Sequence, residues 1–228
     1  MEIKRFIYTF DKSKNIKLSN RLVEAKYKLS LTEIKIVLAI ASQISKSGQR
    51  FESVRASAAA LINFCGLSKK NGYSLLKAAC CSLRSQVIQI KLKDGSWVKT
   101  GFVDLIHYHD GVIDFKFNEG LKEYLLNVAE NYSLLSAKTL CTFNKYWAIR
   151  LYMLIKNEKH MVGHKFYINF IRERLMLPQS YTNITHFKNK FLDACIAEIN
   201  AKSDININYE LFKAISGNAY EKVKFNHI

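Results

Sequence analysis

The sequence predicts an α+β fold in which a group of helices followed by β-hairpins occurs twice along the chain. Residues 31–46 and 142–158 carry apolar side chains at helical spacing, and residues 87–117 alternate apolar and polar side chains around two Asp-Gly pairs. Near Asn131 the order of helices and then strands starts again. With 228 residues, 49% of them hydrophobic, the chain can bury a sizeable core in one or two domains.

The first long helix is predicted to begin after Ser30. Ser30 and Glu33 form a capping box, in which each side chain accepts a hydrogen bond from the backbone amide of the other residue. Residues 20–29 are predicted to be an extended polar segment that leads into this helix. One apolar stripe follows the cap, made by Ile34, Val37, Leu38, Ala41 and Ile44.

A helix-turn-helix is predicted next. Residues 56–64 read as a short helix ended by Gly66, and Ser68 is predicted to cap a second helix over residues 69–83. Its inward positions are predicted to be Leu75, Leu76, Ala79 and Leu83. The exposed first turns of this helix are predicted to contact phosphate or DNA through Lys69, Lys70, Asn71, Ser74 and Lys77. The alternative is an ordinary helical hairpin whose polar face is only solvated.

Strands at residues 87–93, 96–109 and 112–117 complete the first unit. Asp94-Gly95 and Asp110-Gly111 predict tight hairpin turns, because both residue types tolerate positive φ. Helices followed by such strands are the order of a winged helix, with Lys91, Lys93 and Lys99 around the first hairpin. The outer strand of this meander, expected to include Val112 and Ile113, could pair with a second subunit unless Lys91, Lys93 and Lys116 protect it.

The second half repeats this order of elements, though not the residues. Helices are predicted over 142–158, over 168–177 before Pro178, and over 187–200 after a Thr185 cap. The last of these faces inward with Phe187, Phe191, Ala194 and Ile199. Strands at 205–209 and 223–225 flank an uncharged turn, Ser216-Gly217-Asn218. We therefore predict two tandem winged-helix domains, over residues 1–130 and 131–228.

The net charge of +16 and the pI of about 9.6 indicate a polyanionic partner. Both halves are basic, at 21 − 12 = +9 for residues 1–130 and 14 − 7 = +7 for residues 131–228, so the charge is not confined to a tail. The alternative is a lysine-rich surface that reflects composition alone, since Asn and Ile are abundant too.

The cysteines predict neither a zinc site nor a disulfide framework. Their number is odd, no C-x-x-C pair occurs, and the sequence favours reduced core thiols at Cys65, Cys80, Cys81, Cys141 and Cys195. The chain shows no signal-like segment and no run of about 18 uncharged apolar residues. We therefore expect a soluble cytoplasmic protein with no membrane partner.

Three stretches resemble the iteron-binding plasmid replication initiators. They are N-x-L-[IV]-E-A-x-Y-x-L-[ST]-x-x-E at residues 20–33, A-I-R-L-Y-x-L-[IL]-K at 148–156, and Y-x-x-x-x-x-F-[KR]-x-[KR]-[FV]-L-x-x-x-[IV]-x-E-I-N at 181–200. Together they extend from residue 20 to residue 200. Asp204, Ile205 and Tyr209 continue the third.

The resemblance implies an initiator of the bacterial cytosol or nucleoid that binds origin iterons in double-stranded DNA as a monomer. It also implies dimerisation and DNA contact through residues 1–130, the main sequence-specific binding through residues 131–228, and repression of the protein's own promoter. Host initiator and replicative helicase are the further partners it implies. The DNA-binding residues expected in the C-terminal half are Asn183, Thr185, His186, Lys188, Asn189, Lys190, Lys222 and Lys224.

Two departures from the family pattern affect DNA contact. Asn189 stands where an Arg is expected, which shifts base readout from guanine towards adenine. The uncharged second wing leaves phosphate contact to Lys213, Lys222 or Lys224.

Other function classes stay open at this point. A winged-helix transcription regulator without a role in replication has the same physical features. His107-Tyr108-His109 fits the metal-binding pattern of rolling-circle nicking enzymes, but polar residues are also expected at a hairpin turn, and no acidic third ligand is placed nearby by the sequence. No Gly-x-x-x-x-Gly-Lys phosphate loop occurs, so we expect no ATP hydrolysis, no catalytic residue, no resident metal and no cofactor.

Overall fold

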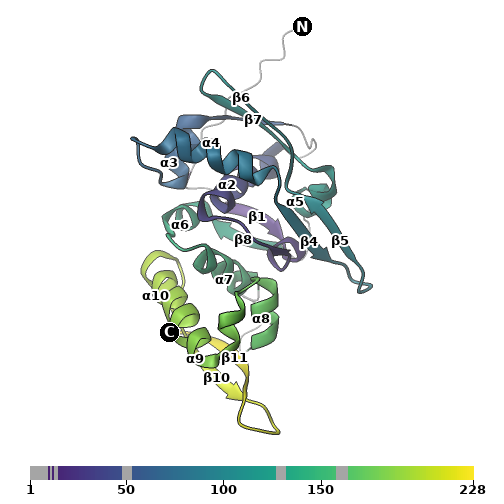
Figure 1. Cartoon of the computed structure of the whole chain (residues 1–228), viewed down its shortest axis with the longest axis vertical. Helices are drawn as coiled ribbons and strands as arrows, with labels where there is room; N and C mark the ends of the chain where they lie inside the picture. Colours follow the sequence, from purple (N-terminus) through teal and green to yellow (C-terminus); the bar gives the residue numbers. More distant parts are fainter. Residues whose placement is uncertain (1–9, 11, 13–14, 48–52, 127–131, 158–163) are drawn as a thin grey trace.

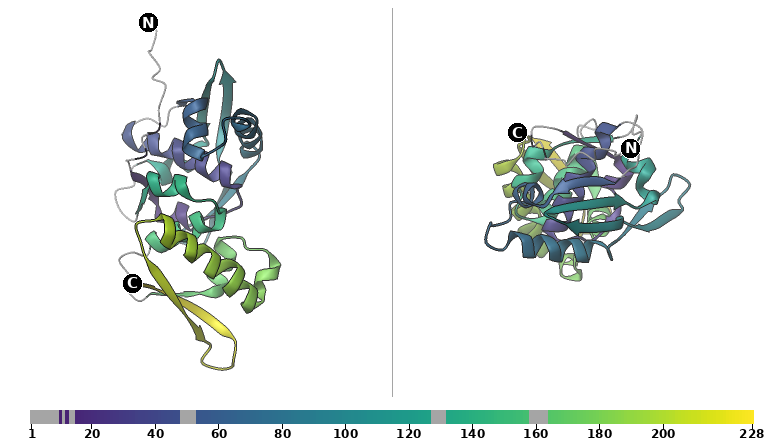
Figure 2. Two further views of the ribbon diagram at one scale, coloured as in Figure 1. Left: turned by 90° about the vertical axis from the view of Figure 1, so that its left-hand side faces the viewer. Right: turned by 90° about the horizontal axis from the view of Figure 1, so that it is seen from above.

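The computed structural model describes residues 10, 12, 15–47, 53–126, 132–157 and 164–228. Two halves follow each other along the long axis of an elongated molecule (Figure 1), and a β-hairpin projects from each end (Figure 2). Each half combines helices with small antiparallel sheets. Among the described helices, none has the length and apolar character needed to cross a membrane.

Helix α2 (Leu31–Ser47) forms the centre of the N-terminal half. The capping box is confirmed, because the amide of Ser30 donates to Glu33 Oε2 at 2.5 Å and the amide of Glu33 donates to Ser30 Oγ at 3.2 Å. The predicted stripe is buried, but so are Ile36, Ala39 and Ile40 on other sides. A helix buried all round lies inside the core and not on its surface.

The prediction that residues 20–29 form a purely extended segment before α2 is wrong. It contains the short helix α1 (Asn20–Val23) and the short strand β2 (Lys26–Tyr27). The hydroxyl of Ser19 accepts the amide of Leu22 and so starts the helical turn.

The helix-turn-helix is confirmed, with α3 (Ala58–Cys65) following strand β3 (Val54–Ser57) and ending at Gly66, whose φ is 69°. Helix α4 (Gly72–Leu83) starts later than predicted, so Lys69 and Lys70 lie in the turn before it. Leu75 is exposed and not inward, because the positions that share the buried face are 76, 79, 80 and 83.

Both Asp-Gly hairpin turns are confirmed, but the strands do not form a single meander. Gly95, Asp110 and Gly111 all have positive φ. Strand β4 (Val87–Lys91) pairs with β2 and with β5 (Trp97–Gly101), whereas β7 (Val112–Phe117) pairs with β3 and with β6 (Val103–His109). The chain changes sheet at Phe102, which is buried.

The prediction that Val112 and Ile113 lie on an outer strand is therefore wrong. The order of the second sheet is β3-β7-β6, so β7 with Val112 and Ile113 is the central strand, and β3 and β6 are the edge strands. Ile113 is buried, because the side chains of a central strand pack against the helices beside the sheet.

A further sheet crosses the predicted division at residues 130 and 131. Strand β1 (Asn15–Ser19) pairs antiparallel with β8 (Tyr132–Ser136), which leads into α6 (Ala137–Thr142) and α7 (Tyr146–Asn157). The short helix α5 (Lys122–Leu125) ends the preceding described segment. Helix α7 is almost wholly buried and contacts α1, β8 and α10. The two halves thus share strands and a buried helix.

The C-terminal half has the order β9 (Lys165–Tyr167), α8 (Ile168–Arg174), α9 (Ile184–His186), α10 (Asp193–Lys202), β10 (Ile207–Lys213) and β11 (Tyr220–His227). Its sheet has the order β10-β11-β9. Between α9 and α10, residues Phe187–Leu192 form a π-helical stretch, so one continuous helix runs from Ile184 to Lys202. Helix α8 ends earlier than predicted, before Met176 with a φ of 50°.

Candidate nucleic-acid interface

The second helix of the C-terminal helix-turn-helix is capped by Asn183, not by Thr185 as predicted. The side-chain oxygen of Asn183 accepts the amides of Thr185 at 2.9 Å and of His186 at 3.1 Å. Both residue types cap helices well, and the earlier one is used here. The side chain of Thr185 is left exposed at the positive end of the helix, where anions are stabilised.

The π-helical stretch carries the three predicted contact residues. Phe187 and Phe191 are fully buried, with ring centroids 5.2 Å apart, and fix the inner face of this stretch. Lys188, Asn189 and Lys190 between them are exposed. A π turn widens the helix locally and is frequent at functional sites. The three consecutive side chains therefore cover the solvent side of the helix start.

Lys188 is not a free cation. Its Nζ lies 3.1 Å from Asp193 Oδ2 and 3.4 Å from Asn189 Oδ1. The other oxygen of Asp193 accepts the hydroxyl of Tyr209 at 2.5 Å, which ties the helix to strand β10. Burial alone would raise the pKa of Asp193, but the bonds from Tyr209 and Lys188 outweigh it and hold the pKa below its ordinary value. A phosphate that binds Lys188 must therefore compete with a charged carboxylate.

A groove of about 460 Å³ lies between the start of this helix and the wing. Thr185 and Lys188 come from the helix, whereas Tyr220 comes from the wing strand β11. The groove thus brings predicted DNA-binding residues together with one that the sequence did not single out. It is lined by Ile184, Thr185, Lys188, Tyr209, Leu211 and Tyr220.

Lys222 and Lys224 of the second wing lie where β11 pairs with β9, whereas Lys213 lies at the last strand pair before the turn. The Nζ of Lys222 sits 4.6 Å from the ring centre of Tyr167, and Lys224 pairs in register with Lys165 of β9. The turn at the tip is uncharged, and Ile215 beside it is fully exposed. A phosphate contact by Lys222 or Lys224 would therefore be made next to β9.

Arg172 supports the recognition helix and was missed by the sequence analysis. Its guanidinium carbon lies 4.9 Å from the ring centre of Phe187, and its Nη2 donates to the carbonyl of Thr182 at 3.0 Å. Burial lowers the pKa of Arg172. In the sequence it looks like any basic residue in the last turn of a helix, so only the contact reveals its role.

The N-terminal candidates are arranged differently. Lys69, Lys70 and Asn71 lie in the turn before α4, and Ser74 and Lys77 lie on the exposed side of that helix. Ser74 and Lys77 also border a groove of about 720 Å³ between α4 and β6. Most of its wall is apolar, with Tyr73, Leu76, Cys80, Leu105, Ile106 and Tyr108.

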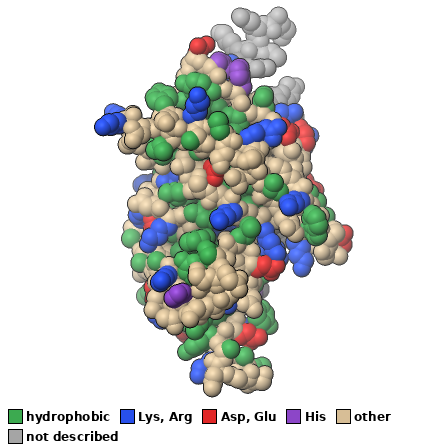
Figure 3. All heavy atoms as spheres, in the orientation of Figure 1, with side chains coloured by type: hydrophobic (Ala, Val, Ile, Leu, Met, Phe, Trp, Pro, Cys, Tyr) green, Lys and Arg blue, Asp and Glu red, His purple; other side chains and the backbone are tan. Residues whose placement is uncertain are grey.

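The remaining N-terminal candidates, Lys91 and Lys93, are exposed at the β4–β5 turn. Helices α4 and α9 lie far apart along the molecule (Figure 1), and Lys and Arg side chains are spread over the visible face of both halves (Figure 3). The basic charge therefore does not gather into one patch on that face.

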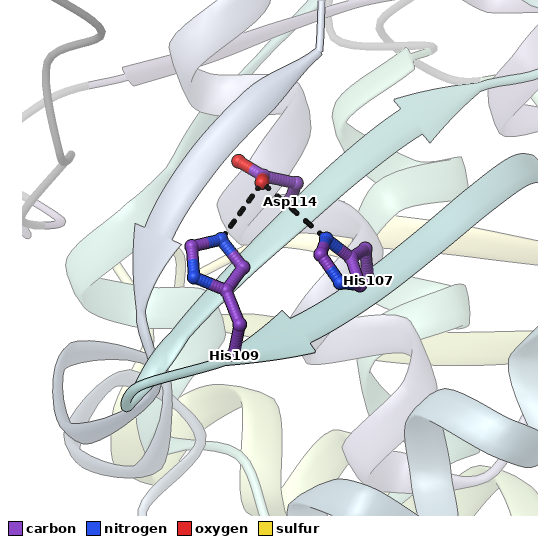
Figure 4. Close-up of side chains that lie close together, drawn as sticks. All are labelled: His107, His109 and Asp114. Atoms are coloured by element: carbon purple, nitrogen blue, oxygen red, sulfur yellow. Dashed lines mark hydrogen bonds and ion pairs between the residues drawn. The ribbon is translucent and has the colours of Figure 1, made fainter.

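The prediction that no acidic group lies near His107 and His109 is wrong. Asp114 on β7 faces both of them (Figure 4). The two-residue turn Asp110-Gly111 pairs 109 with 112 and 107 with 114, so the turn could have revealed this neighbour. Tyr108 points to the other side of the sheet, into the groove beside α4. It is therefore badly placed to act as a nucleophile at these histidines.

Comparison with known proteins agrees with this architecture. Residues 15–156 match the family model described as "Initiator Replication protein, WH1", and residues 167–226 match "Initiator Rep protein, WH2". The first match extends past the division predicted at residues 130 and 131. The solved structure of the Pi initiator protein in complex with iteron DNA is similar with a TM-score of 0.78 and 17% identity, over 95% of this chain and 98% of that one.

A second solved structure, of domains 2 and 3 of RctB, is similar with a TM-score of 0.54 and 8% identity, over 86% of this chain and 80% of that one. At such identities the likeness shows the shared fold of two tandem winged-helix domains. The family models cover most of the sequence and both halves of the structure. The chain belongs to the initiator replication protein family.

Proposed function

We propose that this protein initiates plasmid replication by binding repeated origin sequences, the iterons, in double-stranded DNA. The observation that carries the proposal is the helix start at residues 183–190, where exposed Lys188, Asn189 and Lys190 follow an exposed capped helix end. The match to both family models and the fold shared with an initiator bound to iteron DNA support it.

The C-terminal recognition helix reads the bases in this proposal. Asn189 can form paired hydrogen bonds with adenine, and Lys190 can reach guanine or a phosphate. Lys188 exchanges Asp193 for a phosphate oxygen, with Thr185 and His186 at the positive helix end beside it. Lys222 and Lys224 contact the DNA backbone from the part of the wing that pairs with β9.

The N-terminal half adds DNA contact and self-association in this proposal. Lys69, Lys70, Asn71, Ser74, Lys77, Lys91 and Lys93 are its phosphate-contacting candidates. Binding energy, together with the host initiator and replicative helicase, then opens the origin. The same DNA recognition at the protein's own promoter would repress its gene.

The competing function is transcription regulation without a role in replication. A replicon that carries the cognate origin, with this gene supplied or withheld in the same host, separates the two. Growth of transformants only when the gene is supplied supports initiation. Binding to the promoter without any replication of the origin would favour the regulator.

The DNA contact itself is tested by footprinting the region that flanks the gene. Repeated protected sites are expected with the parent protein and with Lys122→Gln, a surface change on α5 outside the proposed interface. Lys190→Gln, which removes the same charge from the recognition helix, should need a higher protein concentration for the same protection. Equal protection by all three proteins would place the recognition helix elsewhere.

A further inference from the structure

We propose that His107, His109 and Asp114 form a binding site for one zinc-class divalent ion, independent of the DNA-binding surface. The two histidines lie two residues apart on edge strand β6 and so share one face of the sheet. Asp114 lies opposite His107 on β7. The side chains converge in the same place (Figure 4), and their ligand atoms all lie within 4.8 Å of one another.

The distances suit a small tetrahedral ion. Asp114 Oδ2 is 3.1 Å from His109 Nε2 and 4.0 Å from His107 Nδ1. An ion with bonds of about 2.0–2.2 Å to nitrogen and oxygen holds its donor atoms about 3.3 Å apart. The His109–Asp114 pair already meets that spacing, and a small rotation of the exposed His107 side chain brings in the third donor.

The donor set selects the class of ion. Two imidazoles and one carboxylate suit zinc and neighbouring transition metals, whereas magnesium and calcium prefer oxygen ligands throughout. Three protein ligands leave the fourth position open, and the exposure of His107 places that position towards water. The site would hold β6 to β7 beside the turn of the projecting hairpin.

Surrounding charges orient the carboxylate. Arg55 Nε donates to Asp114 Oδ1 at 2.7 Å, which leaves Oδ2 directed at the histidines. Arg55 Nη2 also reaches Oδ2 at 3.1 Å, and this contact must yield to the ion. The carboxylate of Asp110 lies 3.9 Å from the Nδ1 of His109, whereas the Nε2 of the same ring faces Asp114. Such outer partners commonly fix the orientation of metal ligands.

The arrangement does not place Tyr108 as the nucleophile of a nicking centre. Tyr108, the tyrosine between the two histidines, lines the groove on the opposite side of the sheet. A phosphotyrosyl reaction needs the hydroxyl next to the metal-bound phosphate. The expected property is therefore ion binding that fastens the hairpin.

The test titrates the full chain, freed of metal by a chelator, with Zn²⁺ and with Co²⁺. We expect one equivalent of tight binding, and a visible Co²⁺ spectrum without thiolate charge-transfer absorption. Loss of a residue that only contacts a metal ligand lowers metal affinity by roughly 10- to 100-fold. His107→Ala and His109→Ala each remove a ligand, so each should lower Zn²⁺ affinity by more than that. Zn²⁺ should raise the melting temperature of the parent and not that of His107→Ala.

Two matched controls guard against other donors. His227→Ala removes an exposed histidine at the end of β11, and Cys81→Ser removes an exposed thiol, so both should bind like the parent. Because the His107 side chain is mostly exposed, His107→Ala should fold, and its melting temperature without metal checks this. Equal binding by parent and His107→Ala, no binding by the parent, or a thiolate spectrum would overturn the proposal.

Discussion

The guanidinium of Arg150 stacks on the ring of Tyr27, with its central carbon 3.7 Å from the ring centre. The same guanidinium donates to the carbonyl of Ala25 at 2.8 Å and to that of Arg174 at 3.1 Å. Arg150 is fully buried on α7, so one side chain fastens the segment before α2 to the end of α8. This contact joins the two halves of the molecule.

Replacing Arg150 should destabilise the whole chain. Arg150→Ala leaves one buried and one partly buried carbonyl without their donor and empties the space beside Tyr27, so we expect a loss of at least about 2 kcal/mol in the free energy of unfolding. Urea unfolding measures this loss. Arg84→Ala, an exposed change after α4, is the control and should stay within about 0.5 kcal/mol of the parent. Parent-like stability of Arg150→Ala would refute the role assigned to Arg150.

Different substitutions in the recognition helix should affect DNA affinity and sequence specificity separately. Lys190→Ala is expected to weaken binding to cognate DNA by about 1–3 kcal/mol if its side chain reaches a base edge. Asn189→Ala should relax sequence preference at one position, because an amide can read adenine there. Fluorescence anisotropy with cognate and scrambled duplexes measures both. If neither variant differs from the parent on either duplex, these residues do not contact DNA.

Asp193→Asn should strengthen DNA binding. The change removes the charge that holds Lys188 at 3.1 Å, while an amide can still accept the hydroxyl of Tyr209. A freed Lys188 then binds phosphate without competition, and the gain should appear on cognate and scrambled DNA alike. Addition of Lys188→Ala to the same protein should abolish the gain. A gain that survives the double change would have another source.

DNA affinity should fall steeply with salt. Contacts from two basic halves release counterions from several phosphates, so log affinity against log salt should have a slope on the order of −6 to −10. Titrations over a range of potassium chloride concentrations measure it. A slope near zero would argue against duplex DNA as the ligand.

The Asp114–Arg55 pair should make stability depend on pH in the acid range. The hydrogen bond from Arg55 is the main cause that holds the pKa of Asp114 below its ordinary value of 3.8. Because the pKa of Asp114 is lower in the folded than in the unfolded chain, its charged form stabilises the folded protein at pH values above 3.8. This stabilisation is lost as the pH falls below 3.8 and through the pKa of the folded state. Asp114→Asn, measured with a chelator present, should be less stable than the parent at neutral pH, and the difference should shrink in acid.

The cysteines should differ sharply in reactivity. Burial raises the pKa of Cys65, Cys80 and Cys195 to about 12, so these thiols should resist a thiol reagent at neutral pH until the chain unfolds. Cys81 is exposed and should react fast. Cys81→Ser should remove the fast phase in a colorimetric thiol assay. Its persistence would identify a different accessible thiol.

Local signals in the sequence predicted much of the fold correctly. The Ser30–Glu33 capping box, the Gly66 helix end and the Asp-Gly turns act within a few residues, so the sequence alone identifies them. The Thr185 cap was wrong because Asn183 caps equally well in isolation. The residue types alone could not decide between them, and in the structure the side-chain oxygen of Asn183 accepts both amides.

Contacts between distant segments could not be predicted in the same way. The exposed lysines of the recognition helix were recognisable, but the position of Tyr220 beside Lys188 depends on how the wing folds back. The pairing of β1 with β8 and the change of sheet at Phe102 likewise depend on tertiary packing. The burial of Arg150 could not be read from the residue type, because the other basic residue of α7, Lys156, is only partly buried.

The β1–β8 sheet has a consequence for how the chain folds. Its paired residues, Asn15 with Ser136 and Ser19 with Tyr132, lie more than a hundred positions apart in the sequence. Closing so long a loop lowers the chain entropy before the strand pairing can stabilise the fold, and topologies with such distant contacts fold slowly. During synthesis the first strand must wait until residue 136 has left the ribosome. A nascent chain that stops short of β8 would expose the unpaired edge of β1 to aggregation or to chaperones.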